Sequence, residues 1–473
     1  MKAFLLALLI SLTALAERPN FVVIFTDDQG YGDLSCFGAT HVNTPHIDRL
    51  AREGTKLTSF YVAAPVCTPS RAALMTGCYP KRVNMATGSD FVVVLAGDPK
   101  GLHPNEITIA EVLKTRGYAT GIFGKWHLGD QPDFLPTRQG FDEFFGVPYS
   151  HDIHPFHPRQ NRFKFTPLPL LDGEKVIESD PDADYLTKRI TDRAVKFIER
   201  NTEKPFFLYI PHPIPHVPLH VSPPYMKNVS QALKLKLADE KEGTVDYRTR
   251  NGLFRQAITE IDDSVGRIVD TLKKYKLDDN TLVIFTSDNG PAVGKAGPLR
   301  GKKGSAFEGG MREATVAWWP GKIPANHESA ELVTAMDLLP TFAILAGAQA
   351  PTDREIDGKD ISNVLLNRQG KSPHDRFFYH QANNLRAVRA GKWKLYVGPI
   401  GKRGEQKVQT TLFNLNADIG EKINRAAQHP HVVKRLRGYM NAFETELGKG
   451  NNLTKNCRPA GFVKNAKPLV PAR

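Results

Sequence analysis

The sequence predicts an α/β fold, and two observations support this prediction. Short apolar runs of strand length alternate with stretches in which apolar residues recur at helical spacing. Charged or polar residues that can bind metals or transfer protons (Asp, Asn, Lys and His) also follow directly after four of the predicted strands. In a doubly wound sheet, ligands bind beyond the carboxyl ends of the strands, so four such clusters predict one shared site.

The four predicted strands are continuous apolar runs, as expected for strands that are buried on both faces of a sheet. They cover residues 21–25, 119–123, 206–210 and 282–285. The polar residues that follow them are, in chain order, Asp27 and Asp28, Lys125 and His127, His212 and His216, and Asp288 and Asn289. Any one cluster fits a simple turn, but four at equivalent places favour a functional site.

A helix is predicted over residues 258–277. Its apolar residues recur every three or four positions, and Lys273 and Lys274 suit the negative end of the helix dipole. The stretch 336–346 also resembles a helix and is followed by a loop over residues 351–360.

A further helix is predicted after Cys67, with Thr68 as its cap and Pro69 in its first position. Cys67 would then lie at a helix N-terminus, where free N–H groups and the helix dipole favour an anion. Arg71 would add a positive charge about one turn away. A capped helix with an incidental cysteine is the alternative.

The C-terminal part predicts a second, smaller domain. Short strands joined by turns are expected over residues 377–379, 385–389, 393–397 and 411–415, forming an antiparallel sheet. The predicted division of the chain is a signal peptide (1–16), a catalytic domain (17–373), the antiparallel-sheet domain (374–448) and a basic, irregular tail (449–473).

The N-terminus predicts a secretory signal peptide. Lys2 gives it a positive start, residues 3–15 are nearly all apolar, and Ala14 and Ala16 form a small-x-small cleavage pattern. A buried helix or a membrane anchor is the alternative, but the run is shorter than the roughly 20 residues of a span. We expect a soluble mature protein without a transmembrane anchor, secreted or periplasmic, or lysosomal if the source is an animal.

The chain of 473 residues has 63 Lys and Arg against 50 Asp and Glu, a formal charge of +13. This balance predicts an acidic partner, and charge alone leaves open nucleic acid, a membrane surface, or a sulfated or phosphorylated substrate. The 41% hydrophobic content excludes intrinsic disorder. Four cysteines (Cys36, Cys67, Cys78 and Cys457) are too few for a disulfide scaffold, and one unassigned disulfide stays open.

The eleven residues from Cys67 read Cys-Thr-Pro-Ser-Arg-Ala-Ala-Leu-Met-Thr-Gly and resemble the signature of type I sulfatases without departure. Cys67, Pro69 and Arg71 occupy the Cys-x-Pro-x-Arg core, which in that family is read by a maturation enzyme that oxidises the cysteine to formylglycine. The resemblance extends from Asn20 to about Arg425. Residues 146–152 (Gly-Val-Pro-Tyr-Ser-His-Asp) resemble the arylsulfatase A and N-acetylgalactosamine-6-sulfatase branch.

The resemblance implies an alkaline-phosphatase-like sulfatase fold, with a large, mixed, mostly parallel sheet flanked by helices and a smaller C-terminal antiparallel sheet. It also implies Ca²⁺ held by Asp27, Asp28, Asp288 and Asn289 beside the modified Cys67. The residues themselves offer only hard oxygen ligands, which suit Ca²⁺, or less well Mg²⁺, rather than zinc. A strand-end turn at Asp27 and a hairpin turn at Asp288 are the alternatives.

The resemblance also implies the reaction. A hydroxyl of hydrated formylglycine attacks sulfur to give a covalent sulfo-enzyme, and the second hydroxyl then expels sulfate. Arg71 would hold the hydrate, His127 would be the base for elimination, and Lys125 and Lys303 would bind the sulfate oxygens. Lys125 and His127 lie in Gly-Lys-Trp-His-Leu-Gly, a close match to the family's second signature.

Three further assignments carry alternatives. His216 would protonate or stabilise the leaving alcohol, with His212 as the alternative. Lys303 precedes a matching Gly-Ser-Ala-Phe-Glu-Gly-Gly segment, but Lys302 is adjacent. Ser150 would line the sulfate pocket, or be a turn hydroxyl.

We therefore predict a secreted sulfuric-ester hydrolase that acts on a sulfated oligo- or polysaccharide. The alternatives are a formylglycine-dependent phosphonate or phosphodiester hydrolase and a non-catalytic binder of sulfated polymers. No nucleic-acid-binding motif is recognisable, and the oligomeric state stays open. The histidine-rich stretch 151–157 is either a second metal site, the substrate mouth or a solvated loop. Specificity is expected from residues 89–101, 151–169 and 222–250 and from the C-terminal domain.

Overall fold

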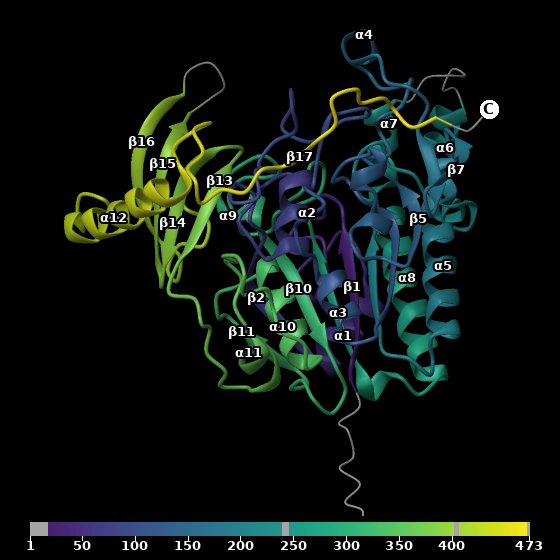
Figure 1. Cartoon of the computed structure of the whole chain (residues 1–473), viewed down its shortest axis with the longest axis horizontal. Coiled ribbons are helices and arrows are strands. Elements are labelled where there is room, and N and C mark those ends of the chain that lie inside the picture. The colour runs from purple at the N-terminus through teal and green to yellow at the C-terminus, as the bar shows by residue number, and fades with distance from the viewer. Residues whose placement is uncertain (1–17, 239–245, 402–405, 471–473) are drawn as a thin grey trace, which may run out of the picture.

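The computed structural model describes residues 18–238, 246–401 and 406–470 (Figure 1). The predicted signal peptide, residues 1–16, lies outside the described residues. Among the described residues, no helix combines the length and the apolar character needed to cross a bilayer.

The larger part of the structure is built on a mixed sheet of eleven strands in the order β11-β2-β10-β9-β1-β8-β4-β5-β6-β7, with β12 beside β2. Its centre, β9-β1-β8-β4-β5, is parallel throughout. The strands are β1 (Asn20–Thr26), β2 (Thr55–Tyr61), β4 (Ala119–Lys125), β5 (Glu143–Val147), β6 (Pro169–Asp172), β7 (Lys175–Ser179), β8 (Phe206–Pro211), β9 (Thr281–Ser287), β10 (Arg312–Trp318), β11 (His327–Ser329) and β12 (Val333–Thr334).

Helices cover both faces of this sheet (Figure 1). Val22 and Ile24 of β1 pack in the core with α1, α5 and α8, whereas Phe21 and Phe25 pack on the opposite face with α2, α3 and α10. Successive strand residues point to opposite faces, so a strand between two helical layers must be apolar at every position. The helices are α1 (Pro45–Glu53), α2 (Cys67–Thr76), α3 (Ile109–Lys114), α4 (Gln160–Phe163), α5 (Leu186–Arg200), α6 (Gln231–Ala238), α7 (Tyr247–Arg250), α8 (Phe254–Lys274), α9 (Glu308–Met311), α10 (Leu338–Leu345) and α11 (Ser362–Leu366).

A separate antiparallel sheet follows, in the order β13-β14-β15-β16. Its strands are β13 (Phe377–Gln381), β14 (Asn384–Ala390), β15 (Trp393–Ile400) and β16 (Lys407–Asn414). The 18-residue helix α12 (Pro430–Leu447), which the sequence analysis did not predict, packs against β14 and β15. The predicted small antiparallel sheet is therefore confirmed, as is the large mixed sheet.

The described part of the tail, residues 449–470, has no helix and a single strand of two residues. It runs back across the larger sheet region (Figure 1, yellow), where β17 (Gly461–Phe462) pairs with β3 (Lys100–Gly101). Arg458 forms an ion pair with Glu106 at 2.7 Å. A basic, polar composition indicates exposure, but it does not exclude specific contacts of this kind.

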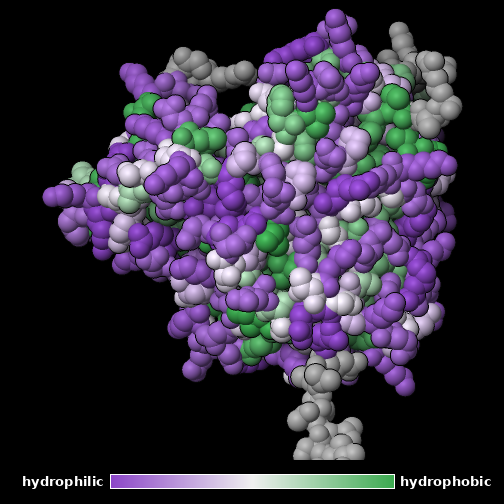
Figure 2. Space-filling view, in the orientation of Figure 1, coloured by the Kyte–Doolittle hydropathy of each residue, from purple (hydrophilic) through white to green (hydrophobic). Residues whose placement is uncertain are grey.

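The predicted helix over 258–277 is observed as α8, which begins at Phe254 and ends at Lys274. The stretch 336–346 is a 3₁₀ turn followed by α10, and residues 351–360 form a loop as predicted. All four cysteines are free in the described structure. The face in Figure 2 is mostly hydrophilic, with its hydrophobic residues scattered.

Candidate active site

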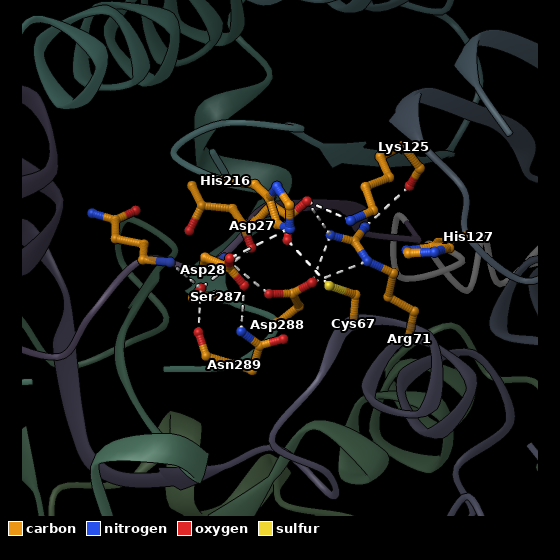
Figure 3. Close-up of polar contacts among 12 residues, drawn as sticks. Asp27, Asp28, Cys67, Arg71, Lys125, His127, His216, Ser287, Asp288 and Asn289 are labelled. Atoms are coloured by element: carbon orange, nitrogen blue, oxygen red, sulfur yellow. Dashed lines mark hydrogen bonds and ion pairs between the residues drawn. The ribbon is translucent and has the colours of Figure 1, made fainter. Parts of the chain in front are cut away.

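The carboxyl ends of β1, β4, β8 and β9 bring the four polar clusters together (Figure 3). Asp28 and His127 each adopt a left-handed backbone there, both with φ of 64°. Such a conformation is unfavourable for residues other than glycine and persists where the surrounding structure enforces it, often at functional sites.

Cys67 is the first residue of α2 and is 2% exposed. The prediction that it lies at a helix N-terminus is confirmed, but the predicted cap is wrong. Val66 occupies the cap position, and Pro69 is the third helical residue rather than the first. The Thr68 hydroxyl donates instead to the carbonyl oxygen of His127 at 3.0 Å, so a tertiary contact takes the place of the local cap.

Three carboxylates and three cations alternate around the Cys67 sulfur. Arg71 Nη2 lies 2.8 Å from Asp288, Lys125 Nζ lies 2.5 Å from Asp27, and Lys303 Nζ lies 2.8 Å from Asp28. These six side chains are buried except that of Lys303, which is 23% exposed. The Cys67 sulfur lies 3.5 Å from Asp27 Oδ1 and 3.6 Å from Lys303 Nζ.

These acidic residues fit a hard divalent cation. The buried Oδ1 of Asn289 has no hydrogen-bond partner among the described residues, while its Nδ2 donates to Asp28 at 2.6 Å. Burial and the neighbouring Asp27 raise the pKa of Asp288 to about 6, as expected where carboxylates crowd together. An unpartnered amide oxygen beside crowded carboxylates is a donor set suited to Ca²⁺ or Mg²⁺.

Burial and the nearby Asp27 raise the pKa of the Cys67 thiol. A reactive cysteine needs the opposite shift, because the thiolate is the nucleophile. The unmodified thiol is therefore poorly suited to attack a substrate, even though it lies at the centre of the cationic groups.

His127 has a defined tautomer. Its Nε2 lies 3.0 Å from the carbonyl oxygen of Val94, which can only accept, so Nε2 carries the proton. Its buried Nδ1 has no partner among the described residues and keeps a free lone pair. Burial and the cations Lys125 and Arg71 hold the pKa of His127 well below its usual value, so the ring is neutral.

The structure distinguishes the paired candidates. His216 lines the cavity at the site, with Nε2 3.6 Å from Asp28, whereas His212 is buried against Ser264 at 3.1 Å. Lys303 reaches Asp28, whereas Lys302 donates to the carbonyl oxygen of Gly294 at 3.0 Å.

A cavity of about 500 Å³ opens from this cluster. Its inner end is lined by Asp28, Cys67, His127, Ser150, His216 and Lys303. The Ser150 hydroxyl is buried and has no hydrogen-bond partner in the described part of the chain. The other predicted site residues are linked to this lining by contacts: Asp27 contacts Cys67, Asp288 and Asn289 contact Asp28, and Lys125 and Arg71 pair with Asp27 and Asp288.

The cavity is also lined by residues from the predicted specificity segments 151–169 and 222–250, for which the sequence indicated no individual role. Asp152 and His157, from the histidine-rich stretch, lie in its wall together with Tyr247. The stretch therefore forms part of a cavity wall rather than a solvated loop. Tyr247 has no motif around it, and only its membership of a predicted specificity segment indicated it.

Comparisons with known proteins agree with this geometry. The Sulfatase family model matches residues 19–348. Human (Homo sapiens) arylsulfatase A is 39% identical over 92% of this chain and 89% of its own length. Pig (Sus scrofa) N-acetylgalactosamine-6-sulfatase is 38% identical over 82% of this chain and 73% of its own length. The crystal structure of the PsFucS1 sulfatase from Pseudoalteromonas sp. superposes with a TM-score of 0.78 at 29% identity, covering 92% of each chain.

Proposed function

The chain belongs to the sulfatase family and is a sulfuric-ester hydrolase, and from this premise we propose that it removes sulfate from a sugar or other alcohol ester with a formylglycine made from Cys67. The observation that carries the proposal is the convergence of Cys67, Arg71, Lys125, His127 and Lys303 at one buried site. The raised pKa of the thiol supports a modified nucleophile, because the thiol itself is not activated.

One hydroxyl of the formylglycine hydrate would attack sulfur while the S–O bond to the leaving alcohol breaks, which transfers the sulfo group to the enzyme. Loss of the proton from the second hydroxyl would then expel sulfate and restore the aldehyde. Lys303 lies 3.6 Å from the Cys67 sulfur, and Lys125 pairs with Asp27, which lies 3.5 Å from it. Both lysines would hold the sulfate oxygens as charge builds up on them. Arg71, fixed by two bonds to Asp288, would orient the hydrate. Ser150 would donate its unpartnered hydroxyl to the sulfate.

His127 and His216 would divide the proton transfers. His127 presents a neutral, unpartnered Nδ1 and would accept the proton in the elimination step. His216 lies on the cavity wall and would serve the leaving alcohol. Asp27, Asp28, Asp288 and Asn289 would hold Ca²⁺, which when bound would stabilise negative charge on the sulfate group.

The substrate is proposed to be a sulfated glycan outside the cell or in a lysosome. The predicted signal peptide would direct the protein to that compartment. The name of one relative, N-acetylgalactosamine-6-sulfatase, supports a sugar sulfate. The test compares kcat/KM for sulfate esters and for phenyl phosphonate. We expect a preference for sulfate; a strong preference for phosphonate would overturn the proposal in favour of a phosphonate hydrolase.

Chelation of the metal is expected to inactivate the protein and lower its Tm. Without the cation, Asp27, Asp28 and Asp288 repel one another, and a ligand at 100 times its Kd stabilises a fold by about 2.7 kcal/mol. Differential scanning calorimetry with a chelator and then with excess Ca²⁺ measures this, with Mg²⁺ as the comparison cation. Unchanged melting and activity in the chelator would argue against a metal site.

Replacing His127 with alanine is expected to lower steady-state kcat on 4-nitrophenyl sulfate by roughly 10²- to 10⁴-fold while keeping a burst of nitrophenol. The base is needed only after the ester bond has broken, so one equivalent of product should appear first. Stopped-flow absorbance measures the burst. His431→Ala, on the exposed face of α12, is the control; a slow first turnover without a burst would assign His127 to the attack step.

A further inference from the structure

The outer part of the cavity is larger than a sulfate group needs, and one wall of it is aromatic. Phe163 stacks on Phe165 at 5.0 Å and meets Phe91 edge-on at 5.7 Å. The ring of His157 lies 5.4 Å from Phe165 and 6.2 Å from Tyr247, which joins these rings into one surface. The wall includes residues from α4 and α7, in the upper part of Figure 1.

Two polar groups beside this aromatic wall have unmet hydrogen-bonding capacity. Asp152 Oδ1 and the Tyr247 hydroxyl are both buried and have no hydrogen-bond partner within the described residues. The Asp152 carboxylate lies 3.8 Å from His157 Nε2 and 4.0 Å from His216 Nδ1, and both distances are too long for a hydrogen bond. Asp152 and Tyr247 both line the cavity that holds Cys67.

Their protonation states define what they can bind. Burial favours the neutral acid, but His216 and His151 lower the pKa of Asp152, so it is a carboxylate that only accepts hydrogen bonds. Burial and the nearby Asp152 raise the pKa of Tyr247, so its hydroxyl keeps its proton and can both donate and accept. The matching ligand carries hydroxyl groups.

We propose that Asp152 and Tyr247 form a subsite for the hydroxyl groups of a sugar ring, whose apolar face lies against the Phe163 wall while its sulfate ester lies at Cys67. A purely aryl or steroid body has no donor for Asp152 and would leave a buried carboxylate unpaired, which is costly. The inference rests on the proposed function and adds the residues that would recognise the sugar, together with one feature of the substrate: a free hydroxyl near the scissile ester.

The test compares wild-type protein with Tyr247→Phe and Asp152→Ala on sulfated oligosaccharides and on 4-nitrophenyl sulfate. We expect kcat/KM on the best sugar sulfate to fall roughly 10- to 100-fold in each variant. On the aryl ester the change should stay within about threefold. Tyr247→Phe removes only an unpartnered hydroxyl, so its Tm should equal or exceed that of the wild type. Tyr439→Phe, on α12, is the matched control.

Each other outcome counts against a specific statement. Equal losses on both substrate types would overturn the subsite, because they would show that Asp152 acts on the reaction itself through His216 rather than on the sugar. Wild-type activity on the aryl ester with none on any sugar sulfate would overturn the subsite and the proposed glycan substrate, but not the proposed hydrolysis of sulfate esters at Cys67. Inactivity of correctly folded wild type on every sulfate ester would overturn the proposed function, and the subsite with it.

Discussion

Replacing Cys67 with alanine is expected to lower kcat on every sulfate ester by about 10⁴-fold or more, because the nucleophile is lost. Lys125, Lys303 and Arg71 would remain, so the variant should still bind substrate or free sulfate. Release of inorganic sulfate measures the rate, and isothermal titration calorimetry measures the binding. Mass spectrometry of the wild-type peptide that contains Cys67 should give the lower mass of formylglycine.

Cys457→Ala is the matched control, since Cys457 is also a free thiol but lies in the tail, with its sulfur 3.2 Å from the carbonyl oxygen of Leu447. Its kcat should equal that of the wild type. Full activity in the Cys67→Ala variant would exclude Cys67 as the source of the nucleophile. An unmodified thiol in active native protein would exclude formylglycine.

The second large effect is expected at Lys394, a fully buried lysine of β15. Its Nζ lies 3.0 Å from Glu308 and 2.9 Å from Glu421, and it donates to the carbonyl oxygen of Ala306. Glu308 also accepts from the hydroxyl of Tyr61 at 2.6 Å. Burial alone would raise the pKa of Glu308, but Lys394 and Arg312 lower it to about 2.

Lys394→Met is therefore expected to lower the free energy of unfolding by about 3–5 kcal/mol, because it removes the buried cation that Glu308 and Glu421 share and leaves Glu308 only the longer ion pair with Arg312, at 3.4 Å. Urea denaturation followed by circular dichroism measures this loss. The pKa of Glu308 is lowered on folding, so its contribution is present above pH 4.5 and disappears as the pH falls toward 2. The wild-type and variant stabilities should accordingly converge in acid.

Lys392→Met is the control, because Lys392 is exposed two residues away on the same hairpin, and a change within about 0.5 kcal/mol is expected. An equal effect of both substitutions would argue against the buried network. The small sheet also contacts the site directly, because Gln381 of β13 donates to the carbonyl oxygen of Gly304 at 2.6 Å, next to Lys303. The small sheet thus supports the segment that carries the proposed sulfate-binding lysine.

Much of the fold was predictable from the sequence because the central strands are apolar at every position. A strand between two helical layers has no polar face, so 21–25 and 282–285 could be recognised without a partner. The helix α12 was missed. The cap of α2 was predicted wrongly because Thr68 has a better partner in the His127 carbonyl than in its own helix.

The residue types at the strand ends and in the Cys67 motif could be read from the chain alone, because they depend on local order. Which member of each pair reaches the cavity, His212 or His216 and Lys302 or Lys303, depends on how distant segments pack. The same packing places Asp152 and Tyr247, which are far apart in the sequence, in the wall of one cavity. The physical reason is that side-chain direction and burial follow from packing between distant segments, which local sequence does not encode.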